Sequence, residues 1–459
     1  MRTDMPPFYV AIVGSGPAGF FSAAALLKLK DVEVHVDMFE RLPTPWGLVR
    51  SGVAPDHPKI KMVSAVFAKT ADHERFRFFG NVELGKDITR GTLLDQYDAV
   101  IYAVGAQEDR RLGIPGEELA GSVAATDVVG WYNGHPDFVS APVDLSAERA
   151  VIFGNGNVAL DVARMLAMSP ADLRATDIAD HALEALESNS IHDVTVLGRR
   201  GPLQATFTPA ELRELGELSG VYVDIDPADL EDITEEDLDA AGSIVRLNIE
   251  ALRDLAGRDR SPEQTKRIAL RFRRSPLELR GDTRVENVVL ARNELRVDST
   301  NGVKTVDSGE RETVEAGLVI RAIGYRGSRL DNVPFDEQRG VIPNEDGRVV
   351  GGDREYVVGW IKRGPSGIIG TNKKCAQDTV DTVVRDIADL VKESRRDSDY
   401  RPNAVSVNRH PQVVLAEHWN AINEYELEVG KRSGRPRVKL CTIPELLEAA
   451  HAVRVSAQK

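Results

Sequence analysis

The sequence predicts an α/β protein with two similar parallel-sheet domains, the second inserted in the first. Two observations predict this fold. An apolar strand, a glycine-rich turn and an apolar helix follow one another at the N-terminus, and the same order returns from residue 150. Two later segments also resemble each other, YDAVIYAVG at Tyr97–Gly105 and GLVIRAIG at Gly317–Gly324. Each is an apolar strand ending in a glycine, which suits a chain that leaves one domain and later returns to it.

The first unit fits the Rossmann-like pattern G-x-G-x-x-G in its full context. Its elements are a strand at Val10–Val13, the turn Gly14-Ser15-Gly16-Pro17-Ala18-Gly19, a helix at Phe20–Leu29 and a strand that ends at Glu40. Gly14 allows a tight turn, Gly16 lets the backbone approach a pyrophosphate, and Gly19 lets the helix pack on the strand. Glu40 can accept hydrogen bonds from the ribose of an adenosine. In this context the motif predicts dinucleotide binding rather than a simple turn.

The second unit reads Gly154-Asn155-Gly156-Asn157-Val158-Ala159, and alanine at the third small position is an accepted variant. Its second strand is followed by Arg199 and Arg200, where an NAD site would carry an acid. Two guanidiniums can hold a 2′-phosphate, so the sequence favours NADP(H) here; a solvated basic turn is the alternative. Two sites with different preferences imply FAD at the first. We therefore expect an FAD-binding domain at 1–107 and 325–459 and an NADP-binding domain at 108–324.

The remaining segments carry fewer signals. The proline-rich stretch Arg41–Pro58 is expected to be an ordered loop without regular structure. The segment Tyr356–Ile369 is expected to be a strand followed by the glycine-rich turn Gly364-Pro365-Ser366-Gly367. A helix is expected next, at Thr371–Lys392, and its positive end could stabilise a reduced flavin. The nearby bases Lys362, Arg363, Lys373 and Lys374 are open to two interpretations: docking of an acidic partner protein, or contacts with phosphate or flavin.

Composition excludes several classes of protein. The 459 residues are 42% hydrophobic, and no apolar run approaches the roughly 20 residues that span a bilayer. No signal-peptide pattern is present, so a cytoplasmic location without a membrane span is expected. The net charge of -14 disfavours nucleic-acid binding, and the acidic run Val221–Ala240 is interpreted as a solvated face.

The two cysteines, Cys375 and Cys441, are too few and too far apart for a four-thiolate iron–sulfur cluster, a thiolate zinc site or a C-x-x-C pair. No metal is therefore expected, and each cysteine is interpreted as a buried helix thiol. Redox chemistry must then use an organic cofactor, and the cysteine pattern also excludes a disulfide reductase.

Several long segments resemble the adrenodoxin reductase-like NADPH–ferredoxin reductase family. They are Pro43–Lys61, Phe153–Arg164, Gly198–Leu215, Gly359–Lys374 and Gly434–Leu440. The resemblance implies hydride transfer from NADPH to FAD and release of single electrons to a ferredoxin- or adrenodoxin-like iron–sulfur protein, with flavodoxin as another acceptor. It implies FAD contacts at Ala18, Glu40, Leu48, Leu84, Trp360, Gly367, Ile368 and Ile369. It implies NADP contacts at Arg110, Asn155, Gly156, Asn157, Val158, Arg199, Arg200, Glu211 and Gly367.

Glu211 and Glu214 are the acidic candidates for a catalytic role. They stand three apart on a helix that Thr208 would start with a capping box, so both carboxylates share one face. A purely capping Glu211 and a solvated Glu214 remain open. In the family resembled, the residue matching His57 lies near the flavin, across from the one matching Glu214. His57 and Glu214 are therefore the candidates for moving the flavin N5 proton, although a structural loop histidine is the alternative for His57.

Two other functions remain open at this point. A flavin-dependent monooxygenase also carries two dinucleotide motifs, although the sequence identifies no pocket for a substrate to be hydroxylated. A non-enzymatic NADPH-binding redox sensor is the other alternative hypothesis.

Overall fold

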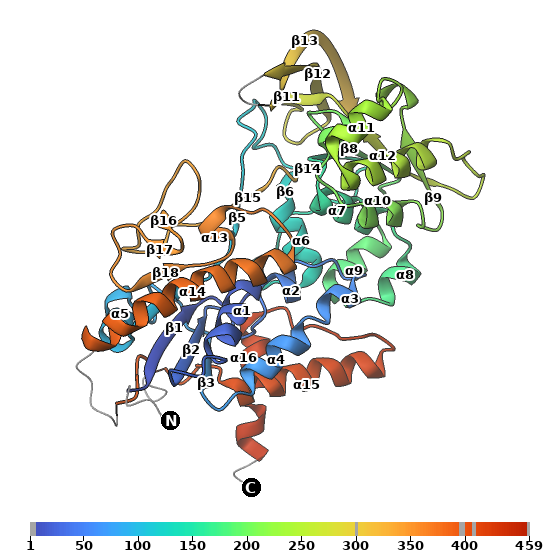
Figure 1. Ribbon diagram of the computed structural model, residues 1–459. Helices are drawn as coiled ribbons and strands as arrows, with labels where there is room; N and C mark the ends of the chain where they lie inside the picture. Colours follow the sequence, from blue (N-terminus) through green and yellow to red (C-terminus); the bar gives the residue numbers. More distant parts are fainter. Residues whose placement is uncertain (1–5, 299–301, 394–399, 406–409, 457–459) are drawn as a thin grey trace. The chain divides into compact units, whose positions relative to one another are not determined.

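The computed structural model of the protein describes residues 6–298, 302–393, 400–405 and 410–456 (Figure 1). The chain forms two compact units. Unit 1 consists of Met1–Glu108 together with Tyr325–Lys459, and unit 2 consists of Asp109–Gly324. None of the helices in the described part of the chain is long and apolar enough to cross a membrane.

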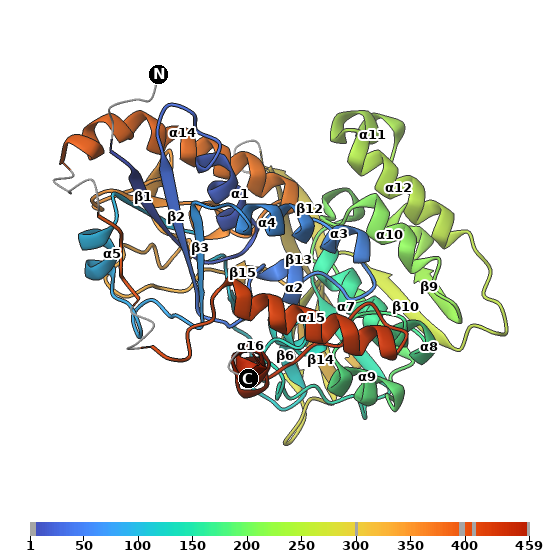
Figure 2. The ribbon, with the colours of Figure 1, turned by 90° about the horizontal axis from the view of Figure 1, so that it is seen from below.

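Unit 1 is built on a seven-stranded sheet whose central strands are parallel. The strands, in spatial order, are β16 (Asn344–Glu345), β17 (Arg348–Val349), β18 (Glu355–Val357), β4 (Ala99–Tyr102), β1 (Phe8–Val13), β2 (Val34–Glu40) and β3 (Phe76–Gly80). The helices are α1 (Pro17–Leu26), α2 (Leu48–Ser51), α3 (Pro58–Lys61), α4 (Ser64–Ala71), α5 (Arg90–Gln96), α13 (Trp360–Arg363), α14 (Ile369–Glu393), α15 (Ala416–Arg432) and α16 (Ile443–Ser456). Figure 2 shows β1, β2 and β3 as neighbouring strands.

The core of unit 1 lies on both faces of this sheet. All six residues of β1 are buried, and successive side chains alternate between two hydrophobic clusters. Phe8, Val10 and Ile12 belong to the cluster that also contains residues of α1 and α14, which run side by side in Figure 1. A strand buried on both faces reads as a continuous apolar run, which is why the sequence pattern of this strand shows no alternation.

Unit 2 is built on a six-stranded, all-parallel sheet. Its strands, in spatial order, are β6 (Ser122–Ala124), β14 (Leu318–Arg321), β7 (Arg149–Phe153), β8 (Asp193–Leu197), β10 (Lys266–Arg271) and β9 (Val221–Ile225). Its helices are α6 (Ala125–Asn133), α7 (Asn157–Ala167), α8 (Pro170–Arg174), α9 (Asp180–Glu187), α10 (Pro209–Leu215), α11 (Glu235–Ala241) and α12 (Ser243–Ala256). A separate antiparallel sheet contains β11 (Arg274–Arg280), β12 (Asn287–Asp298) and β13 (Gly302–Glu315).

Both glycine turns occupy the same topological position. In unit 1, β1 is flanked by β2 on one side and by β4 on the other; in unit 2, β7 is flanked by β8 and by β14. At such a strand the chain order reverses direction across the sheet, and ligands of open α/β folds bind beyond the carboxyl end of the strand there. The α/β fold with two Rossmann-like sheets is therefore confirmed, and each turn follows the strand of its own unit beyond which such folds bind ligands.

Two local predictions are wrong. The segment Arg41–Pro58, predicted to lack regular structure, contains the helical turn α2. The segment Tyr356–Ile369, predicted to be a strand followed by a glycine-rich turn, begins with β18, but this strand already ends at Val357. Gly359, with a φ of 78°, turns the chain there, and α13 begins at the next residue. The long helix predicted after this region is α14 and begins two residues early, at Ile369.

The two cysteines differ from each other. Cys375 is a buried thiol on α14, as predicted. Cys441 was predicted to be the same, but it lies outside a helix, just before α16, and is only half-buried. Burial raises the pKa of the Cys441 thiol to about 11. Neither cysteine forms a disulfide.

The acidic run Val221–Ala240 is not solvated throughout. Asp229 is 8% exposed, and its carboxylate accepts a hydrogen bond from the backbone amide of Phe272 (3.4 Å). Burial raises the pKa of Asp229, and the Phe272 hydrogen bond only partly opposes that rise. The prediction failed because charge spacing along the chain does not reveal that this short loop turns inward.

Candidate functional site

In unit 1 the glycine turn joins β1 to α1. Gly14 has a φ of 103°, and a Cβ there would lie 2.5 Å from the carbonyl oxygen of Ala103, the residue after β4. A Cβ on Gly19 would lie 2.3 Å from the carbonyl oxygen of Gly14. Gly16 differs, because a Cβ there would meet nothing within 4 Å. The fold itself thus requires glycine at the first and third positions, while Gly16 borders open space.

The start of α1 is suited to an anion. Gly16 is its N-cap residue and provides no side-chain hydrogen bond to the first amides of the helix. Such amides, together with the positive end of the helix dipole, attract phosphate groups. The space beside Gly16 and these amides fit the pyrophosphate of a dinucleotide.

Glu40, the last residue of β2, is held beside the turn. Its Oε2 accepts hydrogen bonds from the backbone amide (3.1 Å) and the hydroxyl (2.6 Å) of Ser15. Its Oε1 accepts one from the amide of Leu42 (3.1 Å). A carboxylate has about four lone-pair sites, so these three donors leave capacity for a ribose hydroxyl. Leu84 lies after β3 and is half-buried; the amide of nearby Val82 donates to the carbonyl of Glu40 (2.9 Å).

Leu48 and His57 belong to the proline-rich segment, which is attached to the glycine turn. The Trp46 amide donates to the carbonyl of Ser15 (3.0 Å), and a Cβ on Gly47 would lie 2.9 Å from the Cα of Gly16. Leu48 opens α2 directly after this contact and is 36% exposed. His57 is half-buried and caps α3, with its backbone amide donating to Ala54 (3.1 Å).

Residues 359–372 are far from the first glycine turn in the sequence, but they lie beside it in the folded unit 1. A Cβ on Gly359 would lie 2.7 Å from the Cβ of Ala18, so this backbone packs directly on α1. Trp360 follows, and its buried indole Nε1 has no hydrogen-bond partner among the described residues. A buried donor without a partner costs about 1–3 kcal/mol, which fits a place where a ligand supplies an acceptor.

The turn Gly364–Gly367 leads into α14. Gly367 has a φ of 81°, and the amide of Ile368 donates to the hydroxyl of Thr371 (3.2 Å). The side chain of Ile368 is 65% exposed, and Ile369 is the first residue of α14. Gly367, Ile368 and Ile369 therefore lie at the positive end of this helix, where a negative charge on a ligand would be stabilised.

The four bases of this region divide into two pairs. Lys362 donates to the hydroxyl of Thr379 (2.9 Å), and Arg363 donates to the side chain of Asn372 (2.9 Å). Lys373 and Lys374, on the first turns of α14, are exposed. Only the second pair is thus free to meet an acidic partner.

In unit 2 the glycine turn repeats the geometry of the first. Gly154 has a φ of 128°, and a Cβ there would lie 2.2 Å from the carbonyl oxygen of Ala322, the residue after β14. Gly156 is the N-cap of α7 and again provides no side-chain cap. Ala322 and Ala103 occupy equivalent places, which explains the resemblance between the two strand segments: each supplies the carbonyl against which the first glycine packs.

Arg199 and Arg200 follow β8, the strand next to β7. Their carbonyl oxygens accept hydrogen bonds from the side chain of Asn293 (2.8 Å) and the amide of Arg273 (3.0 Å). Within the described part of the chain, neither guanidinium forms an ion pair. Arg110 is also exposed, and its amide donates to the carbonyl of Gly324 (3.1 Å), just beyond β14. The same edge of the sheet thus presents three cations that a phosphate can bind.

Helix α10 is attached to this second turn. The carbonyl of Asn155 accepts from the amides of Thr206 (3.1 Å) and Phe207 (3.2 Å), and the side chain of Asn157 accepts from the amide of Thr208 (2.8 Å). Val158 follows in the first turn of α7 and is half-buried. These bonds connect the turn directly to the helix that carries Glu211 and Glu214.

The predicted capping box of α10 is wrong. Thr208 is the N-cap residue, but its side chain makes no capping hydrogen bond. Glu211 lies in the first turn and is half-buried, and Glu214 is paired with Arg164 of α7 at 3.5 Å. Arg164 is 1% exposed and also pairs with Asp161 (2.7 Å). Glu214 is therefore oriented by a buried cation rather than freely solvated.

Sequence reasoning missed Trp46, Gly47, Gly359 and Arg164. The Trp-Gly pair inside a proline-rich stretch was a usable signal, because a glycine there allows close approach of backbone. Arg164 gave no signal, since only the packing of α7 against α10 places it beside Glu214.

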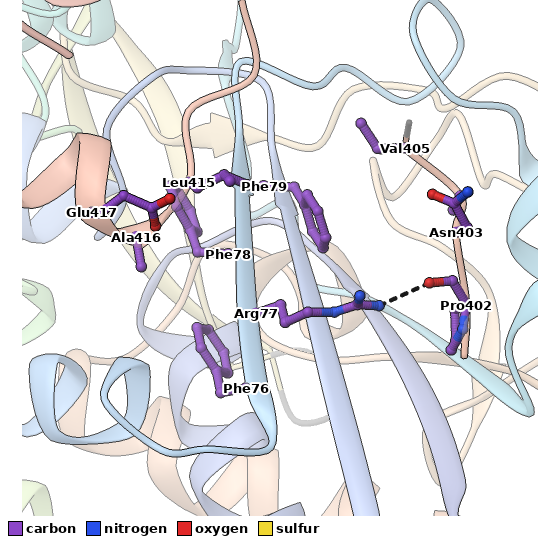
Figure 3. Close-up of a pocket in the computed structure, with 11 residues that line it drawn as sticks. Phe76, Arg77, Phe78, Phe79, Pro402, Asn403, Val405, Leu415, Ala416 and Glu417 are labelled. Atoms are coloured by element: carbon purple, nitrogen blue, oxygen red, sulfur yellow. Dashed lines mark hydrogen bonds between the residues drawn. The ribbon is translucent and has the colours of Figure 1, made fainter. Parts of the chain in front are cut away.

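A cavity of about 560 Å³ also lies in unit 1, beside the edge strand β3 (Figure 3). Its lining comes from Phe76–Phe79, Pro402–Val405 and Leu415–Glu417. Arg77 extends across it and donates to the carbonyl of Pro402 (3.0 Å). None of the predicted site residues lines this cavity, so it is separate from the glycine turns.

Known proteins are similar to this chain in sequence and in fold. Residues 8–215 match the family model described as pyridine nucleotide-disulphide oxidoreductase. The NADPH-ferredoxin reductase FprA of Mycobacterium tuberculosis is 54% identical over 452 residues, covering 96% of this chain and 99% of the relative. The mitochondrial NADPH:adrenodoxin oxidoreductase of Arabidopsis thaliana is 42% identical, covering 97% and 95%.

A solved structure of Mycobacterium tuberculosis FprA in complex with NADPH is also similar. It superposes with a TM-score of 0.93 at 54% identity, covering 97% of this chain and 99% of that chain. Similarity of this extent, over both units and nearly every residue, goes beyond a shared Rossmann-like fold. The chain belongs to the adrenodoxin reductase-like NADPH–ferredoxin reductase family.

Proposed function

We propose that the chain is a ferredoxin–NADP(+) reductase of the adrenodoxin reductase type, with FAD bound by unit 1 and NADP(H) by unit 2. The observation that carries this proposal is the pair of glycine turns at two topological switch points, one followed by Glu40 and the other by Arg199 and Arg200. The family's named relatives reduce ferredoxin or adrenodoxin, which favours this function over a monooxygenase or a redox sensor.

FAD would be held by residues that converge on the first glycine turn. Gly14 and Gly19 shape the turn, Gly16 makes room for the pyrophosphate, and Glu40 binds the ribose. Ala18, Leu48, Leu84, Trp360, Gly367, Ile368 and Ile369 would make the remaining contacts. Bound FAD would accept a hydride from NADPH and release its electrons one at a time.

NADPH would be held by the second turn. Asn155, Gly156, Asn157 and Val158 would face the pyrophosphate at the start of α7. Arg199 and Arg200 would bind the 2′-phosphate, with further contacts from Arg110, Glu211 and Gly367. Arg199 is exposed and Arg200 is half-buried, and neither guanidinium forms an ion pair within the described part of the chain. This supports the assignment, because each guanidinium can bind a phosphate through two hydrogen bonds.

His57 and Glu214 would move the proton that the flavin N5 must lose. The imidazole of histidine titrates near neutrality, which suits proton exchange. Arg164 would orient Glu214 through their ion pair.

The electron acceptor would be an acidic ferredoxin-type iron–sulfur protein, or a flavodoxin. Lys373 and Lys374 support this, because they are exposed beside the turn that is proposed to contact FAD. A cytoplasmic location is also proposed, supported by two cysteines that form no disulfide. Cell fractionation would test the location.

The first test is the visible spectrum of the purified protein, followed by anaerobic addition of NADPH or NADH. We expect flavin bands near 380 and 450 nm (approximate values for a bound flavin) that bleach with far less NADPH than NADH. Candidate ferredoxins should then be reduced at the expense of NADPH. A colourless protein that cannot take up FAD would contradict the reductase, and equal reduction by both nucleotides would contradict the roles of Arg199 and Arg200.

The proton path is tested by His57→Gln and Glu214→Ala. Each should change the pH profile of electron release to ferredoxin, while the exposed control Glu217→Ala should not. Unchanged profiles for both half-reactions in both variants would refute the assignment.

A further inference from the structure

We propose that the buried carboxylate of Glu426, on α15, is a positioning residue for the flavin loop, defined as Trp46–His57. The structure brings this carboxylate, 376 residues away in the chain, into bidentate contact with Arg50 in the middle of that loop. The inference rests on the proposed function, since it concerns the loop that would contact FAD. It gives a role to α15, none of whose residues is a site candidate in the sequence analysis.

The flavin loop begins in a strained conformation. Trp46 has a φ of 85°, a region that bulky L-residues rarely adopt, and Gly47 has a φ of 49°. This strained pair makes the contact with the glycine turn, through the Trp46 amide and the close approach of Gly47 to Gly16. Such a conformation persists only where the surrounding structure enforces it.

Helix α15 holds the loop at two points. Arg50 donates from Nη1 to Glu426 Oε2 (2.8 Å) and from Nη2 to Oε1 (2.5 Å). The side chains are 9% and 0% exposed, so water does not weaken this pair. Trp46 also packs edge-on against Trp419 of α15, with ring centroids 4.9 Å apart, and the Arg50 guanidinium lies over the Trp419 ring.

The carboxylate of Glu426 is saturated by a third segment. Arg437 donates to its Oε2 (2.6 Å), and the amide of Leu440 donates to its Oε1 (2.9 Å). Burial alone would raise the pKa of Glu426, but Arg50 and Arg437 outweigh it and hold that pKa below its usual range. Glu426 is therefore a fixed anion. One of its partners, Arg50, belongs to the flavin loop, whereas the other, Arg437, belongs to the separate Gly434–Leu440 segment.

Variants of Arg50 and Arg437 can distinguish a role of Glu426 in positioning the flavin loop from a role in fold stability alone. Both arginines bind the same buried carboxylate, so removing either guanidinium should destabilise the fold through the same buried charge. Only Arg50 is covalently part of the flavin loop, two residues after Leu48, which is proposed to contact FAD. Loss of Arg50 should therefore remove one of the two contacts that hold the loop on α15 and loosen the loop, and loss of Arg437 should not.

The experiment measures FAD affinity of the apoprotein, by quenching of flavin fluorescence, alongside urea unfolding of the full chain. We expect Arg50→Gln to weaken FAD binding at least about 10-fold through loss of pre-organisation. Arg437→Gln, the matched control, should lose comparable stability yet change FAD affinity less than about 3-fold. Arg50→Lys keeps a cation opposite Glu426 and should give an intermediate affinity, which guards against a variant that fails to fold.

Two outcomes would overturn the inference. One is equal loss of FAD affinity in Arg50→Gln and Arg437→Gln, which would reduce Glu426 to a stability role. The other is unchanged FAD affinity in Arg50→Gln. A wild-type apoprotein that binds no FAD would instead contradict the proposed function, so the two failures are distinguishable.

Discussion

Glycine serves two different purposes within the first turn of unit 1. A Cβ on Gly14 or Gly19 would strike backbone oxygen, whereas a Cβ on Gly16 would meet nothing within 4 Å. The first two positions are therefore determined by the packing of β1, β4 and α1. Gly16 is under no such constraint within the described part of the protein, which supports its proposed role beside the pyrophosphate of FAD.

Gly16→Ala tests this separation. Its φ of -75° is compatible with alanine, so the free energy of unfolding of the apoprotein should change by less than about 0.5 kcal/mol. FAD affinity should fall at least about 10-fold, because the methyl group would occupy space proposed for the pyrophosphate. Titration of apoprotein with FAD would measure this. Gly91→Ala on α5 serves as the control, and a Gly16→Ala protein that binds FAD normally would refute the role.

Asp229 gives a pH-dependent prediction at the same scale. Its folded-state pKa is raised above the ordinary value of 3.8 by burial, so the protonated form stabilises the fold. That contribution is fully present below pH 3.8 and is lost as pH rises through the folded-state pKa. Asp229→Asn removes the titration, so its stability relative to the wild type should increase with pH across this window and then level off.

Urea unfolding at a series of pH values from about 4 to 7 would measure this difference. Asp232→Asn, an exposed substitution in the same acidic run, is the control. Its free energy of unfolding should differ little from that of the wild type, and the difference should not vary with pH. A difference for Asp229→Asn that does not vary with pH would show that the buried carboxyl does not titrate as described.

At the scale of elements, the start of α14 combines two properties. Its positive end faces the turn that is proposed to contact FAD, and its first turns carry exposed Lys373 and Lys374. The other two bases of the region are engaged within unit 1 through Thr379 and Asn372. Of the four bases, Lys373 and Lys374 therefore remain as the candidates for docking an acidic protein.

Reversing both charges, Lys373→Glu with Lys374→Glu, should raise the KM for an acidic ferredoxin by about 10-fold or more at low ionic strength. The effect should shrink with added salt, because surface electrostatics are screened. Ferredoxin-dependent reduction of cytochrome c at several salt concentrations would measure it. Lys431→Glu, an exposed change on α15, is the control. A double variant whose KM equals that of the wild type at low ionic strength would exclude this docking surface.

At the scale of the whole molecule, two complete parallel-sheet units each carry a glycine turn at their own switch point. The two nucleotide sites should therefore be separable by mutation. Gly154→Ala places a side chain at a φ of 128° and 2.2 Å from the carbonyl of Ala322, which should cost unit 2 about 1–3 kcal/mol.

The Gly154→Ala protein should remain yellow and be reduced by dithionite, while reduction by NADPH should slow by about 100-fold or more. Anaerobic stopped-flow spectroscopy would measure both. Gly113→Ala has the same kind of backbone strain in unit 2, with nothing within 4 Å of the added Cβ, and should retain reduction by NADPH. Loss of FAD from Gly154→Ala would contradict the assignment of the two cofactors to separate units.

The sequence by itself determined the fold class, the two glycine turns and the chemistry that follows each, Glu40 in one unit and Arg199 and Arg200 in the other. These features are local: glycines, strand periodicity and the residues after a strand are set within one continuous stretch of each unit, Phe8–Glu40 in the first and Arg149–Arg200 in the second. The roles of individual site residues stay predictions, and the family they suggest is confirmed by similarity over nearly the whole chain.

Only the tertiary structure decided which distant residues meet. It placed Ala103 and Ala322 against the first glycines, paired Arg164 with Glu214, buried Asp229 and joined Arg50 to Glu426. It also ended β18 at Val357, where the sequence pattern continued. The physical reason is that periodicity reports whether a side chain is buried, but not its partner; the partner depends on the path of the chain between segments far apart in sequence.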